Sequence, residues 1–320
     1  MNVLVTIPLA AGHEEILRDA APDYTFRLLE KESAVTQEDV DFADIILGNA
    51  PPSFLKGRQK LQWLQTASAG VEPYLPPGTL PENTLLTNTT GAYGLAIAEH
   101  MLGMLFGVIK KLAQYRDRQH EEAWESLGSV KSIVGSTVLV LGLGDIGGEF
   151  AKRCKALGAY VIGMRRSNTA KPDYADEICL TADLDSMLPR ADVVAISLPG
   201  TDETTNLIDK NRIEKMKDGA VIINVGRGKI IDTNALCDAL ESGKLMGAAL
   251  DVTEPEPLPK GHRLWKIPTA VITPHISGYY HLKYTHDKVV EICANNLARF
   301  HDGKPLQNKV DFRTGYRTSQ

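Results

Sequence analysis

Three side chains suited to hydride-transfer chemistry follow separate apolar runs in the second half of the sequence. They are Arg227, after Asn224-Val225-Gly226, Asp251, after Gly247-Ala248-Ala249-Leu250, and His275, after Thr273-Pro274. Reduction of a 2-oxoacid needs a cation that holds the carboxylate and polarises the ketone, and an acid that protonates the oxygen. Arg227 and His275 suit these roles, and Glu256 could hydrogen-bond His275 and favour its protonated form.

Taken singly, a histidine or a glutamate is typical of any protein surface. In doubly wound sheets, however, ligands bind outside the carboxyl ends of the strands. If the three apolar runs are strands, the side chains that follow them gather at one edge of the sheet. Such a convergence is difficult to explain by core packing, and it favours a catalytic site.

A glycine-rich turn upstream predicts where a dinucleotide binds. The apolar strand at residues 138–141 leads into a G-x-G-x-x-G motif and then into a helical stretch. The first glycine makes a tight turn, the second lets the backbone approach a pyrophosphate, and the third lets the helix pack on the strand. The residues expected to contact the cofactor here are Gly142, Gly144, Asp145, Ile146 and Gly147.

Two arginines stand where NAD-binding proteins usually carry an acidic residue. The strand that follows the glycine-rich turn ends at Arg165-Arg166-Ser167, about 20 residues past the motif. A carboxylate would repel a ribose 2′-phosphate, whereas arginine can bind one. The sequence therefore predicts that all three residues contact the cofactor and that NADP is preferred, with NAD possible. The alternative is a solvated arginine pair beside either cofactor.

Short β-branched runs alternate with amphipathic helical stretches along the whole chain. This alternation predicts an α/β fold with two doubly wound parallel sheets. The strands of the first sheet are expected at residues 3–7, 25–28, 44–47, 63–66 and 85–87, and those of the second at 137–141, 160–162, 193–197, 220–224, 248–251 and 270–273. Apolar residues at helical spacing predict one helix from Ile97 through Leu112, buried on several sides, and another over 289–300.

The composition is that of a globular protein without an obvious macromolecular partner. A formal net charge of -5 gives no support for binding to nucleic acid or to an anionic membrane. The four cysteines lie far apart and have no zinc-ligand spacing, so no metal site is expected. The first apolar stretch lacks a preceding basic residue, no apolar run approaches ~18 residues, and free thiols are typical of a reducing compartment, so we expect a cytoplasmic protein.

The chain resembles the D-isomer-specific 2-hydroxyacid dehydrogenase family, including its glyoxylate/hydroxypyruvate reductases and phosphoglycerate dehydrogenases. The motifs that carry the resemblance are the turn that begins at Gly142 and the segments 224–228, 247–252, 256–259 and 273–278. The resemblance implies a flavodoxin-like substrate domain at residues 1–95, completed by 287–320. A Rossmann cofactor domain at 96–286 would be inserted between these segments, with the active site in the cleft. Family members are commonly homodimers that pair through the cofactor domain.

The resemblance also implies roles for individual residues. It makes Arg227, Glu256 and His275 the catalytic set. Further cofactor contacts would come from Leu198, Pro199, Thr204, Val225, Gly226, Asp251 and Ser277, with Asp251 near the nicotinamide carboxamide. The substrate would be bound by Ser68, Ala69 and Gly70, the N–H groups of Ala69 and Gly70 gripping its carboxylate, and bordered by Tyr93. The arginine pair is the departure from the family pattern.

Other functions and the identity of the substrate remain open at the level of sequence. A formate dehydrogenase of the same fold is expected to pair its histidine with Gln, because hydride leaves formate without a proton transfer, and Glu256 argues against it. A dinucleotide-sensing regulator, as in related transcriptional corepressors, is a second alternative, and a phosphoglycerate dehydrogenase without an appended regulatory domain is a third. The pocket walls that select the 2-oxoacid are expected among Leu9, Tyr74, Tyr93, Tyr279 and Tyr280.

Overall fold

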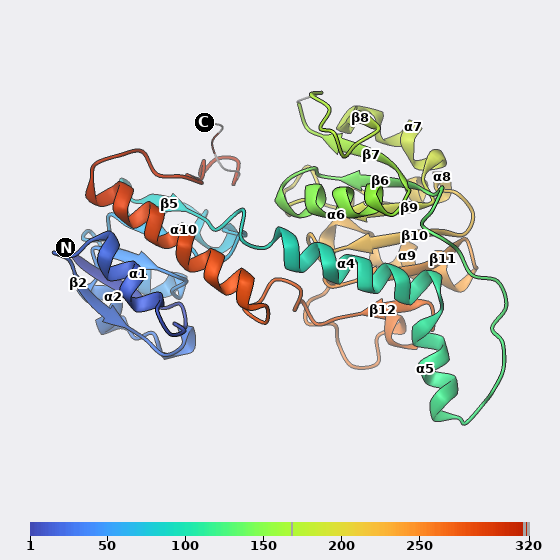
Figure 1. Cartoon of the computed structure of the whole chain (residues 1–320), viewed down its shortest axis with the longest axis horizontal. Coiled ribbons are helices and arrows are strands. Elements are labelled where there is room, and N and C mark those ends of the chain that lie inside the picture. Colours follow the sequence, from blue (N-terminus) through green and yellow to red (C-terminus); the bar gives the residue numbers. More distant parts are fainter. Residues whose placement is uncertain (168, 316–317, 319–320) are drawn as a thin grey trace. The chain divides into compact units, whose positions relative to one another are not determined.

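The strands of the computed structural model, which describes residues 1–167, 169–315 and 318, form two parallel sheets (Figure 1). The chain divides into two units. Unit 1 contains Met1–Tyr93 and Tyr280–Gln320, and unit 2 contains Gly94–Tyr279. The predicted fold class, two parallel-sheet α/β domains, is confirmed.

Unit 1 is built on a five-stranded sheet of short strands in the order β2-β1-β3-β4-β5. These strands are β1 (Asn2–Val5), β2 (Thr25–Leu28), β3 (Ile45–Leu47), β4 (Trp63–Gln65) and β5 (Leu85–Thr87). Its helices are α1 (His13–Ala20), α2 (Gln37–Phe42), α3 (Pro52–Leu55) and the carboxyl-terminal α10 (Lys283–His301).

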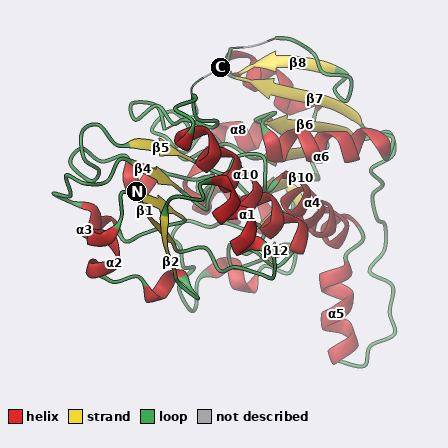
Figure 2. Cartoon of the chain, turned by 60° about the vertical axis from the view of Figure 1, so that its left-hand side comes forward, coloured by secondary structure: helices red, strands yellow, loops and turns green. Residues whose placement is uncertain are grey.

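The last helix is an integral part of this first unit. Helix α10 lies beside α1, as both views show (Figure 2). The Trp63 ring stacks on Phe300 with ring centroids 5.3 Å apart, and Asn296 donates a buried 2.8 Å hydrogen bond to Gln65. These contacts join residues more than 200 positions apart, so the core of unit 1 is built from two distant segments of the chain.

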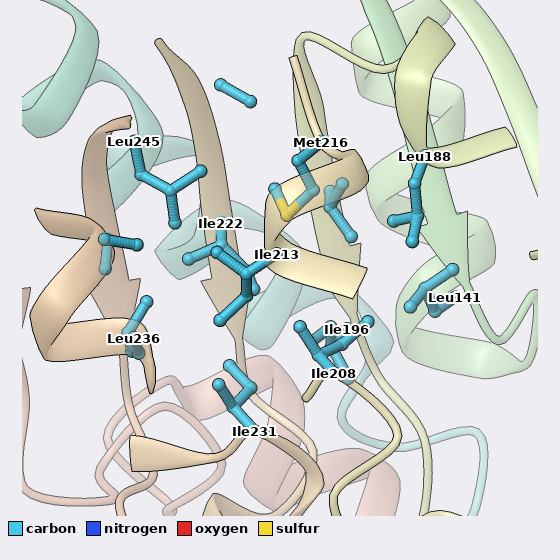
Figure 3. Packing of buried hydrophobic residues seen from close by; sticks show 14 of the residues in the cluster. Leu141, Leu188, Ile196, Ile208, Ile213, Met216, Ile222, Ile231, Leu236 and Leu245 are labelled. Atoms are coloured by element: carbon cyan, nitrogen blue, oxygen red, sulfur yellow. The ribbon is translucent and has the colours of Figure 1, made fainter. Parts of the chain in front are cut away.

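Unit 2 contains a seven-stranded sheet in the order β12-β11-β10-β9-β6-β7-β8. Its strands are β6 (Thr137–Leu141), β7 (Tyr160–Arg165), β8 (Glu177–Leu180), β9 (Val193–Ile196), β10 (Ala220–Asn224), β11 (Leu245–Leu250) and β12 (Ala270–Ile272). Its helices are α4 (Gly94–Ile109), α5 (Leu112–His120), α6 (Asp145–Ala156), α7 (Leu184–Met187), α8 (Lys210–Lys215) and α9 (Thr233–Glu241). Figure 3 shows the packed side chains between the sheet and α8 and α9, where Ile213, Met216, Ile222 and Leu236 lie together.

The strands of unit 2 end in register along one edge of the sheet. Leu141, Ile196, Asn224, Leu250 and Ile272 are consecutive partners across β6, β9, β10, β11 and β12. Neighbouring strands are about 4.8 Å apart, so β10 and β12 end roughly 10 Å from each other, with β11 between them. Every loop that leaves this row therefore begins at the same edge.

Several element boundaries differ from those expected from the sequence. The helix expected over 289–300 begins six residues earlier, at Lys283. The predicted helix through Leu112 stops at Ile109, because Lys111 adopts a left-handed backbone with φ 58° and Leu112 begins a separate helix. Strand β8 was not predicted; it is a four-residue edge strand with one buried side chain. Strand β7 continues to Arg165 and β11 begins at Leu245, each three residues beyond the expected limit.

All four cysteines are buried free thiols. Burial raises the pKa of Cys154 to about 12 and, together with neighbouring carboxylates, the pKa of Cys179 to about 11. Burial also raises the pKa of Cys237 and of Cys293. Within the described part of the chain, no helix is both long enough and apolar enough to cross a membrane.

Candidate active site

The glycine-rich turn lies between β6 and α6 and leaves room for a ligand on one side. Gly142 has a left-handed backbone with φ 96°, and a Cβ on Gly147 would lie 1.9 Å from the Gly142 carbonyl oxygen. A Cβ on Gly144 would meet no atom within 4 Å. Gly144 is the N-cap of α6 and provides no side-chain cap for the first-turn N–H groups. These N–H groups and the open space at Gly144 fit a pyrophosphate.

Asp145 and Ile146, the first two residues of α6, have different environments. The Asp145 carboxylate accepts a 3.0 Å hydrogen bond from the N–H of Gly94, which is the first residue of α4. A Cβ on Gly94 would lie 2.5 Å from Asp145 Oδ1, so only glycine fits there without a shift. Ile146 is half-buried in the first turn of α6. Asp145 therefore joins the starts of two helices.

Arg165, Arg166 and Ser167 lie at the carboxyl end of β7, next to the glycine-rich turn. Gly142 donates to the carbonyl of Met164 at 3.2 Å, which places the end of β7 beside that turn. Arg165 is half-buried and donates to the Ala170 carbonyl at 3.0 Å, whereas Arg166 and Ser167 are exposed. Both arginines therefore lie at the end of the strand that pairs with β6, beside the glycine-rich turn.

The loops after β9 and β10 pack tightly against each other. A Cβ on Gly226 would lie 2.4 Å from the Leu198 carbonyl oxygen, and Val225 donates to the Ile196 carbonyl at 3.1 Å. Thr204 fixes the first of these loops by donating to the Pro199 carbonyl at 2.7 Å. The residues after β9 and β10 that were predicted to line the cofactor site therefore form one connected rim, made of Leu198, Pro199, Thr204, Val225 and Gly226.

Arg227 leaves this rim immediately after β10. Asn224 accepts from Gly226 N–H at 3.0 Å and donates to the Arg227 carbonyl at 2.9 Å, so the strand end holds the backbone on both sides of the arginine. The guanidinium donates to the Gly226 carbonyl at 2.8 Å. The side chain packs across Gly200, where a Cβ would meet Arg227 Cγ at 2.9 Å.

Asp251 lies at the end of β11 and holds the next loop in place. Its side chain is 1% exposed and accepts hydrogen bonds from the Thr273 hydroxyl at 2.5 Å, the Ile276 N–H at 3.0 Å, and the Ser277 N–H and hydroxyl at 3.1 and 2.5 Å. Burial would raise the pKa of Asp251, but these hydrogen bonds outweigh it and the pKa lies below its usual value. Asp251 is therefore an ionised anchor for residues 273–277.

His275 stands in the middle of that anchored loop and pairs with Glu256. Its Nδ1 lies 2.6 Å from Glu256 Oε1, with side chains 45% and 40% exposed. Its N–H donates to the Asp251 carbonyl at 2.8 Å, and its backbone is left-handed with φ 52°. Such a backbone costs free energy in a non-glycine residue and persists where its surroundings hold it. The ring is oriented through Nδ1, and Nε2 is the other site for proton exchange.

A histidine of α4 that has no signal in the sequence also reaches this loop. His100 Nε2 lies 3.0 Å from the Thr273 hydroxyl oxygen and 3.7 Å from Asp251 Oδ1. Its separation from Thr273 is 173 residues. Neither residue was singled out from the sequence, because only the fold brings α4 to the end of β12.

The predicted carboxylate-binding segment lies after β4 in unit 1 and has its carbonyl groups turned into the protein. Ala67 accepts from the Thr89 hydroxyl at 2.7 Å and from the Tyr93 hydroxyl, and Ala69 accepts from Asn88 at 2.9 Å. The Thr66 hydroxyl donates to the Ser68 carbonyl at 2.8 Å, and the Ser68 hydroxyl donates to the Gly70 carbonyl at 2.6 Å.

The N–H groups of this segment are available for a ligand. Among the residues that the structure describes, none accepts a hydrogen bond from the N–H of Ser68, Ala69 or Gly70. Consecutive N–H groups of this kind form an anion-binding concavity. The segment in unit 1 can therefore bind a carboxylate.

The side chains expected as pocket walls differ in their exposure to solvent. Tyr74 and Tyr93 are buried, and their hydroxyl groups donate to the Ala50 and Ala67 carbonyls. Burial raises the pKa of Tyr93 and of Tyr280, and that of Tyr74 to about 12. Tyr93 therefore supports the 67–70 segment from behind, whereas Leu9 is half-buried and Tyr279 is exposed.

A parallel sheet with this glycine-rich turn, and with a histidine–carboxylate pair beyond the same edge, defines a nicotinamide-dependent oxidoreductase. Comparison with known proteins specifies it further. Residues 102–277 match the family model described as "D-isomer specific 2-hydroxyacid dehydrogenase, NAD binding domain". The chain belongs to the D-isomer specific 2-hydroxyacid dehydrogenase family, and it is an NAD(P)-dependent dehydrogenase or reductase.

Three relatives illustrate the similarity. A family protein of known structure from Aeromonas salmonicida is 35% identical with a TM-score of 0.84, over 97% of this chain and 99% of that one. A family member from Xanthobacter autotrophicus, solved with NADPH and MES, is 26% identical with a TM-score of 0.82, over 98% and 99%. A glyoxylate reductase from Thermofilum pendens is 32% identical over 74% of this chain and 71% of its own length.

Proposed function

We propose that this protein reduces a small 2-oxoacid to the D-2-hydroxyacid with NADPH, and that Arg227, Glu256 and His275 are its catalytic residues. The observation that carries the assignment is the 2.6 Å contact between His275 Nδ1 and Glu256 Oε1, in a loop fixed to the end of β11. A carboxylate at Nδ1 stabilises the imidazolium, which can then give up a proton from Nε2.

The proposed reaction consumes one hydride and one proton. C2 of the substrate would receive the hydride from NADPH when that cofactor is held at the glycine-rich turn. His275 donates its Nε2 proton to the ketone oxygen and then recovers a proton from solvent, while Glu256 keeps its contact with Nδ1. Arg227 polarises the ketone and neutralises the developing negative charge on its oxygen. In the reverse direction His275 accepts the hydroxyl proton.

We assign recognition of the substrate carboxylate to the N–H groups of Ala69 and Gly70. Support comes from the carbonyl groups of residues 67–70, each of which accepts a hydrogen bond from within unit 1. With these carbonyls fixed, the segment does not have to reorganise when an anion binds, which lowers the entropic cost of binding. Recognition of this kind is common to every 2-oxoacid and does not depend on its side chain.

The NADPH preference rests on Arg165 and Arg166. Their position at the end of β7 suits contact with a ribose 2′-phosphate, and the family member from Xanthobacter autotrophicus was solved with NADPH. Charge-assisted hydrogen bonds to a phosphate contribute about 1.5–3 kcal/mol each. NADH lacks the group that would make them.

A formate dehydrogenase activity is disfavoured by the chemistry of the pair. Oxidation of formate transfers a hydride and no proton, so it has no use for a carboxylate that stabilises an imidazolium. Glu256 is such a carboxylate. The name of the Thermofilum pendens relative supports glyoxylate as a member of the proposed substrate class.

We also propose that the protein is a homodimer, with α5 and the loop that follows it as the contact region. In both views α5 extends away from the sheet of unit 2 (Figures 1 and 2). Leu112, Trp124 and Val134 are exposed there, Trp124 completely. Exposed apolar groups of this size mark a protein-binding surface, and a second copy of the chain is the occupant that fits the family. Light scattering of the wild type and of Trp124→Ala tests this, with a fall in mass expected for the variant.

The test of the proposed reaction is a panel of 2-oxoacids assayed with NADPH and with NADH. The panel contains glyoxylate, hydroxypyruvate, a branched-chain and an aryl 2-oxoacid, with formate and NADP as the contrasting pair. We expect turnover of at least one 2-oxoacid, with the larger kcat/KM for NADPH. Absence of turnover on the whole panel would overturn the 2-oxoacid assignment, and equal efficiency with NADH would overturn the cofactor preference.

A further inference from the structure

The hydroxyl group of Thr273 lies between two ionisable side chains of unit 2. Thr273 Oγ1 is 2.5 Å from Asp251 Oδ1 on one side and 3.0 Å from His100 Nε2 on the other. Asp251 is 1% exposed, and the side chain of His100 is 23% exposed. The three residues come from α4, the end of β11 and the end of β12, so the contact joins three separate elements beside His275.

The positions of the protons in this chain follow from the chemistry of its members. The lowered pKa of Asp251 keeps its carboxylate ionised, so it can only accept hydrogen bonds. The single hydroxyl proton of Thr273 therefore points to Asp251 and not to the weakly accepting sulfur of Met104, 3.8 Å away. The hydroxyl oxygen must then accept from His100, which requires a proton on its Nε2. The direction of donation is His100 to Thr273 to Asp251.

We propose that His100 is a positioning residue for the proton donor His275. Donation from His100 orients the Thr273 hydroxyl towards Asp251 Oδ1, the same oxygen that accepts from the Ile276 N–H. The other Asp251 oxygen holds Ser277, and the Asp251 carbonyl holds the His275 N–H. His100 thus fixes the Asp251 carboxylate through Thr273, and Asp251 in turn determines the position of His275. This inference rests on the proposed role of His275.

Helix α4 is suited to this task because two of its polar contacts lead to different parts of the site. Its first residue, Gly94, is bound by Asp145 at the glycine-rich turn, and His100 follows less than two turns later. A single rigid helix therefore contacts both the pyrophosphate-binding turn and the His275 loop. Met101 and Leu105 of the same helix are buried in the hydrophobic core.

Four substitutions and one matched control test the proposal. His100→Ala removes the donor, whereas His100→Gln keeps an amide N–H close to the position of Nε2. Thr273→Val removes the hydroxyl, and Thr273→Ser keeps it. Thr269→Val is the control, because the Thr269 hydroxyl is buried four residues earlier and has no hydrogen-bond partner among the described residues. The kinetic readouts are kcat and KM for the 2-oxoacid, and the primary isotope effect with 4-deuterated NADPH.

We expect His100→Ala and Thr273→Val each to lower kcat by about 10- to 100-fold, as a small displacement of a proton donor does. The isotope effect should rise, since chemistry becomes rate-limiting, while KM and the Kd of NADPH change little. His100→Gln, Thr273→Ser and Thr269→Val should retain most of the wild-type kcat. The double variant His100→Ala/Thr273→Val should lose no more than either single variant, because both act through one chain of hydrogen bonds.

A measurement independent of turnover accompanies the kinetics. In protein labelled with 15N-histidine, the ring signals of His275, assigned with His275→Gln, should shift in His100→Ala and return in His100→Gln. Wild-type kcat in His100→Ala, or a His100→Gln variant no better than His100→Ala, would overturn the positioning role. If His100→Ala does not fold, the contrast between Thr273→Val and Thr273→Ser decides the question. Failure of the proposed function appears differently, as an active His275→Ala enzyme.

Discussion

The Nδ1 atom of His275 lies 2.6 Å from Oε1 of Glu256, although 19 residues separate them. The histidine follows β12 and the glutamate follows β11, so the pairing depends on two adjacent parallel strands that end in register. The contact with Glu256 occupies Nδ1 of His275, and the same contact fixes the orientation of the ring and so the direction of Nε2. Its role as a proton donor can be tested without disturbing the dinucleotide site.

Replacing His275 with alanine should nearly abolish reduction. Loss of a positioned general acid usually lowers the rate about 100- to 10,000-fold. The Kd of NADPH, measured by the fluorescence of the bound cofactor, should stay close to the wild-type value, because the glycine-rich turn belongs to β6 and α6. Retention of most of the activity by His275→Ala would remove this residue from the reaction.

Glycine-to-alanine substitutions in the dinucleotide turn should separate folding from cofactor binding. A Cβ at Gly147 would lie 1.9 Å from the Gly142 carbonyl oxygen, so Gly147→Ala should lower the melting temperature sharply. A Cβ at Gly144 has no neighbour within 4 Å, so Gly144→Ala should keep the wild-type stability and lose affinity for NADPH. Thermal unfolding with and without cofactor measures both effects. Tight cofactor binding by Gly144→Ala would mean that the pyrophosphate does not approach this turn.

The arginine pair should determine the choice between the two cofactors. Arg166→Ala should reduce kcat/KM for NADPH by about 10- to 100-fold, the equivalent of one charge-assisted hydrogen bond, and leave the value for NADH almost unchanged. Lys260→Ala, which removes an exposed positive charge after β11, serves as the control for net charge. An equal loss with both cofactors would indicate a structural role for Arg166 instead.

Asp251 should make a contribution to stability that disappears in acid. Its pKa is lowered in the folded protein, so the stabilisation is present above its unfolded pKa of about 3.9 and is lost as the pH falls through the folded pKa. Asp251→Asn should therefore lower the free energy of unfolding by about 3 kcal/mol at pH 7. In urea titrations the difference between wild type and variant should shrink below about pH 4. A difference that does not depend on pH would show that the charge of Asp251 is not what stabilises the loop.

Two threonines of unit 1 provide a matched test of the anion-binding segment. Thr89 donates to the Ala67 carbonyl at 2.7 Å, and Thr84 donates to the Leu61 carbonyl at 2.9 Å before β5 begins. Each valine substitution should cost about 1 kcal/mol of stability. Of the two variants, only Thr89→Val should also raise KM for the 2-oxoacid, because Thr89, unlike Thr84, donates a hydrogen bond to the 67–70 segment. If both variants raise KM equally, the effect comes from loss of stability and not from the segment.

The sequence was sufficient to predict the two parallel sheets and the row of strand ends, since both follow from local patterns. Apolar runs of four to six residues indicate strands, and the glycine-rich turn identifies the pyrophosphate site without any tertiary information. The position of His275 beside Glu256 was also accessible, because both follow predicted strands.

Features that depend on tertiary packing could not be predicted. Strand β8 has only four residues and is held at the sheet edge by pairing with β7, so its apolar run is too short to distinguish it from a loop. The end of α4 depends on a left-handed Lys111, a conformation that lysine does not signal. The contact of His100 with Thr273 requires the packing of α4 against β12. The hydrogen bonds from Asn88, Thr89 and Tyr93 to the 67–70 segment join residues 19 to 26 positions apart.

Because all four cysteines are buried, the surface of the folded protein presents no cysteine thiol to alkylating reagents. A thiol alkylates through its thiolate, and burial keeps all four side chains both inaccessible and protonated. Cys293 belongs to unit 1, while Cys154, Cys179 and Cys237 belong to unit 2. Maleimide mass tagging during slow denaturation would therefore record the opening of each unit separately, without an engineered label. For the same reason, a single cysteine introduced on the surface would carry a fluorophore with no background from the native thiols.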